Sequence, residues 1–176
     1  MAYANFLSGI AGHPLRLALN VGKTIAAAHL LAEYGFSVAP ASGASMLPTF
    51  DVDGNTVVVD HRYRHGRGIV VGDLVSYSIP IFKHSMGIKR VLGMPGDYVL
   101  IDSPDSAGGR MIQVPQGHCW IVGDNIEYSR DSRTFGAVPL ALIKGKAVLR
   151  GVSMFDWQVL ENGLADPKGG EETRGS

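Results

Sequence analysis

Short runs rich in valine, isoleucine and tyrosine, separated by glycine, proline and aspartate, fill the sequence from Gly43 to about Gly151. β-branched and aromatic residues favour extended strands, and the separating residues favour turns. No apolar pattern with a helical period of useful length interrupts these runs. The sequence therefore predicts a mainly β fold, with an antiparallel sheet that is either curled or divided in two. The expected strands cover residues 55–60, 69–78, 82–92, 98–101, 111–114, 119–122 and 143–149.

The composition bounds the size and the partners of this chain. Its 176 residues suffice for one domain with a short appendage, and a hydrophobic content of 45% allows a packed core. The 16 basic and 16 acidic residues give a formal net charge of zero. Because no nucleic-acid-binding motif is present either, we expect no nucleic-acid partner. Cys119 is the single cysteine, which excludes an intramolecular disulfide and favours a buried, apolar setting for its thiol.

The chain divides into three segments. Residues 1–41 contain an alanine-rich stretch that predicts a helix over about 15–39, residues 42–158 form the β-rich domain, and the polar tail 159–176 is expected to be disordered. Lys23 and Glu33 bracket the apolar core of the helix, whereas a membrane span needs about 20 mostly apolar residues. From the pattern alone, a membrane anchor and an amphipathic helix lying on the domain or on a membrane surface both fit.

Ser45 and Lys89 can form a nucleophile and its base. Ser45 lies in the segment SGASMLPT, residues 42–49, whose glycine and proline favour a loop that can bring a backbone N–H close to a substrate. A serine hydroxyl needs a neighbouring base to take its proton. Lys89, in the segment IKRVLGMPGD, is such a base if burial keeps its amine neutral. Taken singly, a turn serine and a lysine that extends to solvent are the simpler interpretations.

A third block contains possible supporting groups. The sequence GDN at 123–125 is typical of a turn, because Asp and Asn side chains bond the local backbone. Ser129, Asp131 and Arg133 follow it. The carboxylate of Asp131 and the guanidinium of Arg133 can pair, and Ser129 shares a face with Asp131 if the segment is extended.

Taken together and in this order, the three blocks resemble the type I signal peptidases. The motifs are GxSMxPT, then KRVxGxPGD, then GDN with SxDSR, and the resemblance runs from about Ser42 to Lys146. Within that family the chain looks most like catalytic subunit 1 of the mitochondrial inner membrane peptidases. The short catalytic region and the arginine at 133, where the sister subunit usually carries asparagine, favour that branch.

The resemblance implies a role for each matching residue. Ser45 would attack the scissile carbonyl, and Lys89 would act as general base and then as proton donor to the leaving amine. Ser129 would hydrogen-bond the lysine amine, and Asp131 and Arg133 would form an ion pair that supports this wall of the site.

The resemblance also implies an oxyanion hole and a pocket for small side chains. The Ser45 backbone N–H would be one oxyanion donor. Some bacterial members place a serine two residues before the nucleophile as a second donor, but Gly43 stands there in this chain. We therefore leave the second donor unassigned. The residues expected to line the substrate pocket are Met46, Phe50 and Ile88.

For the whole chain, the resemblance implies a signal-peptidase-like antiparallel β domain behind a membrane-anchoring helix. The function expected is that of a membrane-bound serine endopeptidase that removes sorting peptides from precursor proteins delivered to the mitochondrial intermembrane space, with its catalytic domain facing that space. A sister peptidase subunit and a small accessory subunit are the expected partners, and no cofactor is expected.

Two other functions compete with this one. A non-catalytic adaptor subunit would keep the fold and bind precursors, although it would not need Lys89. A soluble, self-cleaving Ser-Lys regulator would need a DNA-binding domain, for which residues 1–41 are too short. We expect no metal site: the segment DVDGN at 51–55 lacks the spacing of a calcium loop, and His61 and His65 have no acidic residue between them.

Overall fold

The computed structural model describes residues 14–82, 85–101, 109–153 and 156–164. The chain forms two compact units, which divide between Phe36 and Ser37. This boundary precedes the expected one at 41/42, because residues 37–41 belong to the first strand of the second unit.

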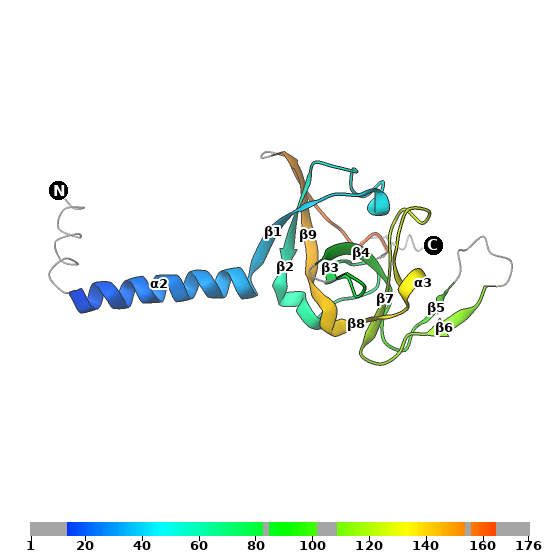
Figure 1. Ribbon diagram of the computed structural model, residues 1–176, viewed down its shortest axis with the longest axis horizontal. Helices are drawn as coiled ribbons and strands as arrows, with labels where there is room; N and C mark the ends of the chain where they lie inside the picture. Colours follow the sequence, from blue (N-terminus) through cyan, green and yellow to red (C-terminus); the bar gives the residue numbers. More distant parts are fainter. Residues whose placement is uncertain (1–13, 83–84, 102–108, 154–155, 165–176) are drawn as a thin grey trace, which may run out of the picture. The chain divides into compact units, whose positions relative to one another are not determined.

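The first unit holds helix α2, Pro14–Tyr34 (Figure 1). Proline suits the first helical position, where no intrahelical partner for an N–H is lost. The helix ends earlier than the expected residue 39, because Gly35 closes it with an N–H bond of 2.9 Å to the Leu31 carbonyl and a strand begins at Phe36. Among the described residues, no helix combines the length and the apolar character needed to cross a membrane. The anchoring role of this segment stays a prediction.

The second unit is built from short strands and single helical turns. The turns are the 3₁₀ helices η1 (Ala44–Met46), η2 (His61–Gly66) and η3 (Leu140–Leu142), and the short helix α3 (Ser132–Phe135). The strands are β1 (Phe36–Ala41), β2 (Asn55–Asp60), β3 (Leu74–Ser78), β4 (Met86–Gly93), β5 (Tyr98–Leu100), β6 (Met111–Gln113), β7 (His118–Val122), β8 (Val138–Pro139), β9 (Ile143–Ser153) and β10 (Asp156–Val159).

Most strands join one curled sheet (Figure 1). Within the described residues the order is β1-β2-β9-β3-β4-β7-β8, with β10 paired to β9, while β5 and β6 form a separate hairpin. Every pair with a described register is antiparallel. The predicted mainly β, antiparallel fold is therefore confirmed.

Each expected strand corresponds to an observed one, whereas three observed strands were not expected. The expected runs 69–78 and 82–92 are too long at their N-terminal ends, because β3 begins at Leu74 and β4 at Met86. The missed strands are β1, β8 and β10. The first two contain proline, and β10 is only Asp-Trp-Gln-Val, so their extended conformation comes from pairing with neighbours rather than from their own propensity.

The tail also begins later than expected. Val159 ends β10, and the N–H of Leu160 donates to the Val148 carbonyl of β9 at 2.9 Å. The side chain of Asn162 donates to the Val71 carbonyl at 2.8 Å. Residues 159–164 are thus part of the packed domain, and the remainder of the expected disordered tail lies outside the described residues.

Three apolar clusters form the core, and strand β4 contributes Val91 to the largest and packs Ile88 against the second. The largest includes Val75, Tyr77, Val91 and the buried Cys119, as expected for that thiol. Strand β4 pairs with β3 over residues 86–90 but with β7 only from Arg90 onward. Residues 86–89 therefore have a β-strand on one side and, among the described residues, no paired strand on the other.

Candidate active site

Ser45 lies in the single turn η1, which a glycine introduces. Gly43 has φ 110° and ψ 147°, a conformation that residues with a Cβ rarely adopt, and its N–H donates to the Val52 carbonyl at 2.7 Å. The buried side chains of Met46, at the end of the turn, and of Phe50 pack in one cluster with Val57. The packing of these two side chains thus fixes the backbone next to Ser45 on the apolar core.

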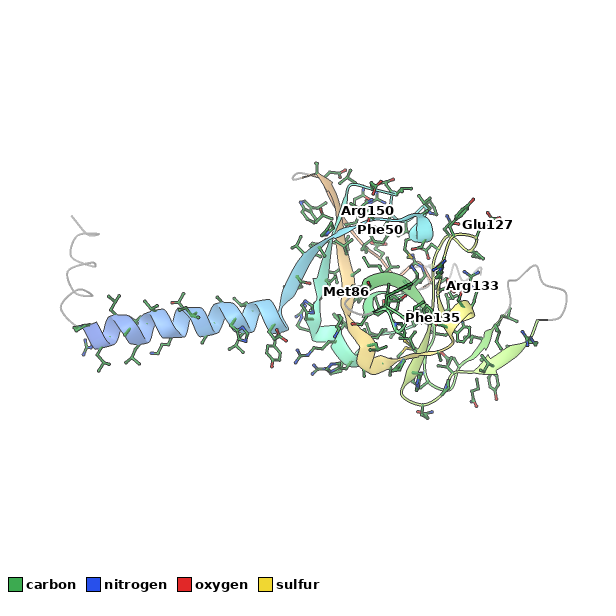
Figure 2. The ribbon with its side chains drawn as sticks, in the orientation of Figure 1. Phe50, Met86, Glu127, Arg133, Phe135 and Arg150 are labelled. Carbon is green, nitrogen blue, oxygen red and sulfur yellow. The ribbon has the colours of Figure 1, made fainter. Side chains whose placement is uncertain are left out.

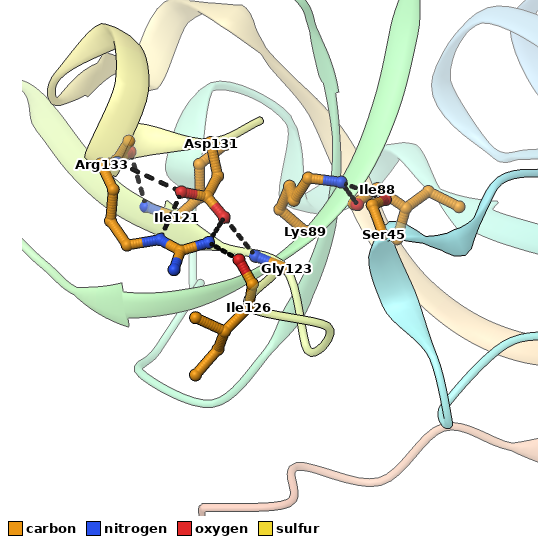
Figure 3. Close-up of polar contacts among 9 residues, drawn as sticks. Ser45, Ile88, Lys89, Ile121, Gly123, Ile126, Asp131 and Arg133 are labelled. Atoms are coloured by element: carbon orange, nitrogen blue, oxygen red, sulfur yellow. Dashed lines mark hydrogen bonds and ion pairs between the residues drawn. The ribbon is translucent and has the colours of Figure 1, made fainter. Parts of the chain in front are cut away.

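Lys89 lies on β4 opposite Val75 and is 5% exposed. It shares its face with Gly87 and Val91, as the strand alternation predicts. Its Nζ donates to the Ser45 Oγ at 2.6 Å and to the Ile88 carbonyl at 3.0 Å (Figure 3). The structure therefore brings the predicted nucleophile and base into direct contact.

Burial lowers the pKa of Lys89, because the charged ammonium loses its hydration. The carboxylates of Asp131 and Asp124 act in the opposite direction and favour the ammonium, but they do not outweigh burial. The lowered pKa increases the neutral fraction of the amine near neutral pH, which is the form that can accept a proton from Ser45.

Asp131 and Arg133 form the predicted ion pair. Arg133 Nη2 lies 2.9 Å from Asp131 Oδ2, and Nε donates to Oδ1 at 2.9 Å (Figure 3). The fully buried carboxylate also accepts the N–H of Gly123 at 2.9 Å and caps helix α3. Burial alone would raise the pKa of Asp131, but the bonds from Arg133 and Gly123 outweigh it and hold the pKa below its usual value.

Ser129 lies close to Asp131 but does not make the expected hydrogen bond to Lys89. Its hydroxyl is buried and has no hydrogen bond of ordinary geometry to any described residue. It is nevertheless close enough to Asp131 to help lower the pKa of that carboxyl. A Cβ at Gly123 would overlap both the Ser129 hydroxyl and the Ser45 carbonyl, so glycine lets the three segments meet.

Two bridges to residues 42–50, which we call the serine segment, were not assigned from the sequence, although their residues lie in the quoted motifs. Arg90, next to the lysine, forms a bidentate pair with Asp124 at 2.8 and 2.7 Å, and Asp124 also accepts a hydrogen bond from the Thr49 hydroxyl. Asn125 donates its backbone N–H to the Ser45 carbonyl at 3.1 Å and its amide to the Ala44 carbonyl at 3.0 Å. The GDN block therefore fixes the position of the nucleophile.

A cleft of about 300 Å³ opens beside Ser45 and Lys89. The three residues expected to form the substrate pocket, Met46, Phe50 and Ile88, all line it. Two side chains that line the cleft, Phe50 and Met86, are labelled in Figure 2. The remaining lining residues are Ala39, Pro40, Ala41, Ser42, Gly43, Val57, Val59, Ser76, Ile79 and Gly87. A nucleophile, a buried amine and an apolar cleft together suit acyl transfer at a peptide carbonyl.

Comparison with known proteins agrees with this chemistry. Residues 15–108 and 100–152 match the family described as signal peptidase, peptidase S26. The chain is 37% identical over 166 residues to the human mitochondrial inner membrane protease subunit 1, which covers 93% of this chain and 96% of that protein.

Two fungal proteins of the same name are also similar. The Schizosaccharomyces pombe protein is 40% identical over 136 residues, or 77% of this chain and 85% of its own length. The Saccharomyces cerevisiae protein is 38% identical over 132 residues, or 68% and 70%. The resemblance inferred from the sequence motifs is confirmed. The chain belongs to the signal peptidase family, peptidase S26, and is a serine peptidase of that family.

Proposed function

We propose that Ser45 is the catalytic nucleophile and Lys89 its general base. The observation that carries this proposal is the 2.6 Å contact between Lys89 Nζ and Ser45 Oγ, in a setting that lowers the pKa of the lysine. The amine takes the hydroxyl proton as Oγ attacks the scissile carbonyl, and returns it to the leaving amine when the peptide bond breaks. Water then attacks the acyl ester, with Lys89 again taking the proton.

The substrate lies extended in the cleft. Residues 39–43 and residues 86–89 of β4 both line the cleft. The Ile88 carbonyl faces the site, because it accepts a bond from Lys89 Nζ. An extended peptide can pair with backbone groups on the strand edge that β7 leaves free, and Met46 and Phe50 contact its side chains. The Ser45 N–H is one donor to the oxyanion.

The biological role is the removal of sorting peptides from precursor proteins at the mitochondrial inner membrane, with the catalytic domain in the intermembrane space. The names of the relatives support the location, and the word subunit in them supports an assembly with other chains. A sister peptidase subunit and a small accessory subunit are the partners we propose. Helix α2 anchors the chain, and the unit that begins at Ser37 carries the catalysis.

Replacement of the two reacting groups tests this function. In mitochondria that contain only the variant chain, Ser45→Ala and Lys89→Ala should each abolish processing, and N-terminal sequencing of the accumulated precursors should identify the substrates. Lys144→Ala is the matched control, since Lys144 is an exposed lysine on β9. Normal processing by either active-site variant would refute the mechanism. Release of the chain by carbonate extraction of the membranes would refute the anchor.

A further inference from the structure

The segment that follows β10 packs against the apolar cluster next to the proposed nucleophile. We call residues 160–164 the C-terminal strap. Leu160 is bound to β9 through its N–H, and its side chain packs on the cluster that contains Met46 and Phe50. These are the two buried residues of the serine segment. The strap therefore contacts the apolar cluster that holds the backbone next to Ser45.

Asn162 attaches the strap to the turn before β3. Its amide donates to the Val71 carbonyl at 2.8 Å and lies 3.3 Å from Asp73 Oδ1, while its carbonyl oxygen accepts the Leu164 N–H at 3.0 Å. The amide fills the space where a Cβ of Gly72 would lie. The amide nitrogen thus holds the strap on the Val71–Asp73 turn, while the amide oxygen makes a hydrogen bond within the strap.

The Val71–Asp73 turn also binds the side chain of Arg90. The Gly72 carbonyl accepts a bond of 2.8 Å from Arg90 Nη1, and the Gly72 N–H donates to the Val91 carbonyl. A Cβ on Gly163 of the strap would lie 3.5 Å from the same Nη1. The other two nitrogens of Arg90 bind Asp124, which accepts the Thr49 hydroxyl. A continuous set of contacts therefore runs from Asn162 through Gly72, Arg90 and Asp124 to the serine segment.

We propose that Asn162 is a positioning residue for catalysis, which holds Ser45 in line with Lys89 through the Arg90–Asp124 pair. This inference rests on the proposed Ser45–Lys89 function. Asn162 does not line the substrate cleft, so its loss displaces the nucleophile without removing a substrate contact. A displacement of the order of 1 Å can cost up to about a hundredfold in rate.

The test compares Asn162→Ala with Glu161→Ala in the full-length protein, purified in detergent with the subunits that accompany it. Glu161 is an exposed neighbour on the same strap. With a precursor-derived peptide that the parent protein cleaves, Asn162→Ala should lower kcat roughly tenfold while KM changes by less than about twofold. Glu161→Ala should leave both constants unchanged. Asn162→Gln, which moves the amide outward, should act in the same direction as Asn162→Ala and replaces it if the alanine variant does not fold.

A double-mutant cycle with Thr49→Val separates positioning from a general loss of stability. Thr49→Val removes the hydroxyl through which Asp124 holds the serine segment. In that background Asn162→Ala should lower kcat by less than about twofold, because the link it acts through is already broken. An unchanged kcat in Asn162→Ala, or an equal fall in both backgrounds, would overturn the positioning role. Cleavage that survives Ser45→Ala in the same assay would instead refute the proposed function itself.

Discussion

At the scale of single residues, the site depends on a lysine whose burial disfavours the charged ammonium form. Lys89 is almost fully buried, and the residues that share its face of the strand are Gly87 and Val91. Its lowered pKa means that the folded chain binds this proton more weakly than the unfolded chain does. Stability therefore rises with pH between the lowered pKa and the ordinary lysine pKa of 10.5, and is lost as pH falls through that window.

Replacement of this lysine should separate stability from activity. Lys89→Met should abolish cleavage, because no base remains for Ser45. It should also raise the free energy of unfolding at neutral pH, because the apolar side chain fills a similar volume without the cost of a buried amine. Denaturant unfolding of the parent and the variant checks this, and a variant less stable than the parent at neutral pH would contradict it.

Asp131 changes stability with pH in the same direction as Lys89, but in a lower pH window. Its folded pKa lies below the ordinary value of 3.8, so its stabilisation is complete above that pH and is lost as pH falls through the folded pKa. Asp131→Asn should lower the free energy of unfolding by about 1–3 kcal/mol at neutral pH, since it leaves Arg133 without its charged partner. The difference from the parent should disappear in acid. A difference that stays constant down to pH 2 would show that the ion pair is not its source.

At the scale of elements, the serine segment is held between a glycine and the GDN turn. Gly43 sets its entry, and Asn125 bonds both carbonyls around the nucleophile. These contacts orient the Ser45 Oγ more narrowly than its short side chain could alone, because they fix the backbone on both sides of it.

Gly43→Ala should therefore impair both folding and catalysis. Nothing lies within 4 Å of a Cβ at this position, so any cost comes from the φ of 110° rather than from a clash. We expect a loss of about 1–3 kcal/mol in stability, with a fall in kcat as the segment relaxes. Parallel denaturant and kinetic measurements check this, and parental values in both would contradict the role given to the glycine.

The elements also show what the sequence could and could not reveal. Runs such as Asn55–Asp60 were predictable because valines fill them, and the three motif blocks were identifiable because their residues are close in sequence. Strand β1 was not predictable, since Phe-Ser-Val-Ala-Pro-Ala is extended only by its pairing with β2. The Arg90–Asp124–Thr49 bridge depends on three segments that meet only in the fold, which no local pattern indicates.

At the scale of the whole domain, a buried ion pair joins β9 to the turn that carries the strap. Lys146 Nζ lies 2.7 Å from Asp73 Oδ1, whose side chain is fully buried. Lys146→Met should lower the free energy of unfolding by about 3 kcal/mol, because it leaves the Asp73 charge buried without its partner. Lys144→Met, at an exposed position of the same strand, should change it by less than about 0.5 kcal/mol. Equal effects of the two substitutions in urea unfolding would refute the importance of the pair.

The most direct test of the Ser45–Lys89 mechanism is an NMR titration of Lys89 in the full-length chain, with its signal assigned by its loss in Lys89→Met. We predict that the amine titrates below the ordinary lysine pKa of 10.5, because it is buried, and that kcat/KM rises with pH at the same midpoint. A Lys89 pKa at or above 10.5 would contradict its role as the neutral base for Ser45. So would a kcat/KM profile whose midpoint differs from that of the Lys89 titration.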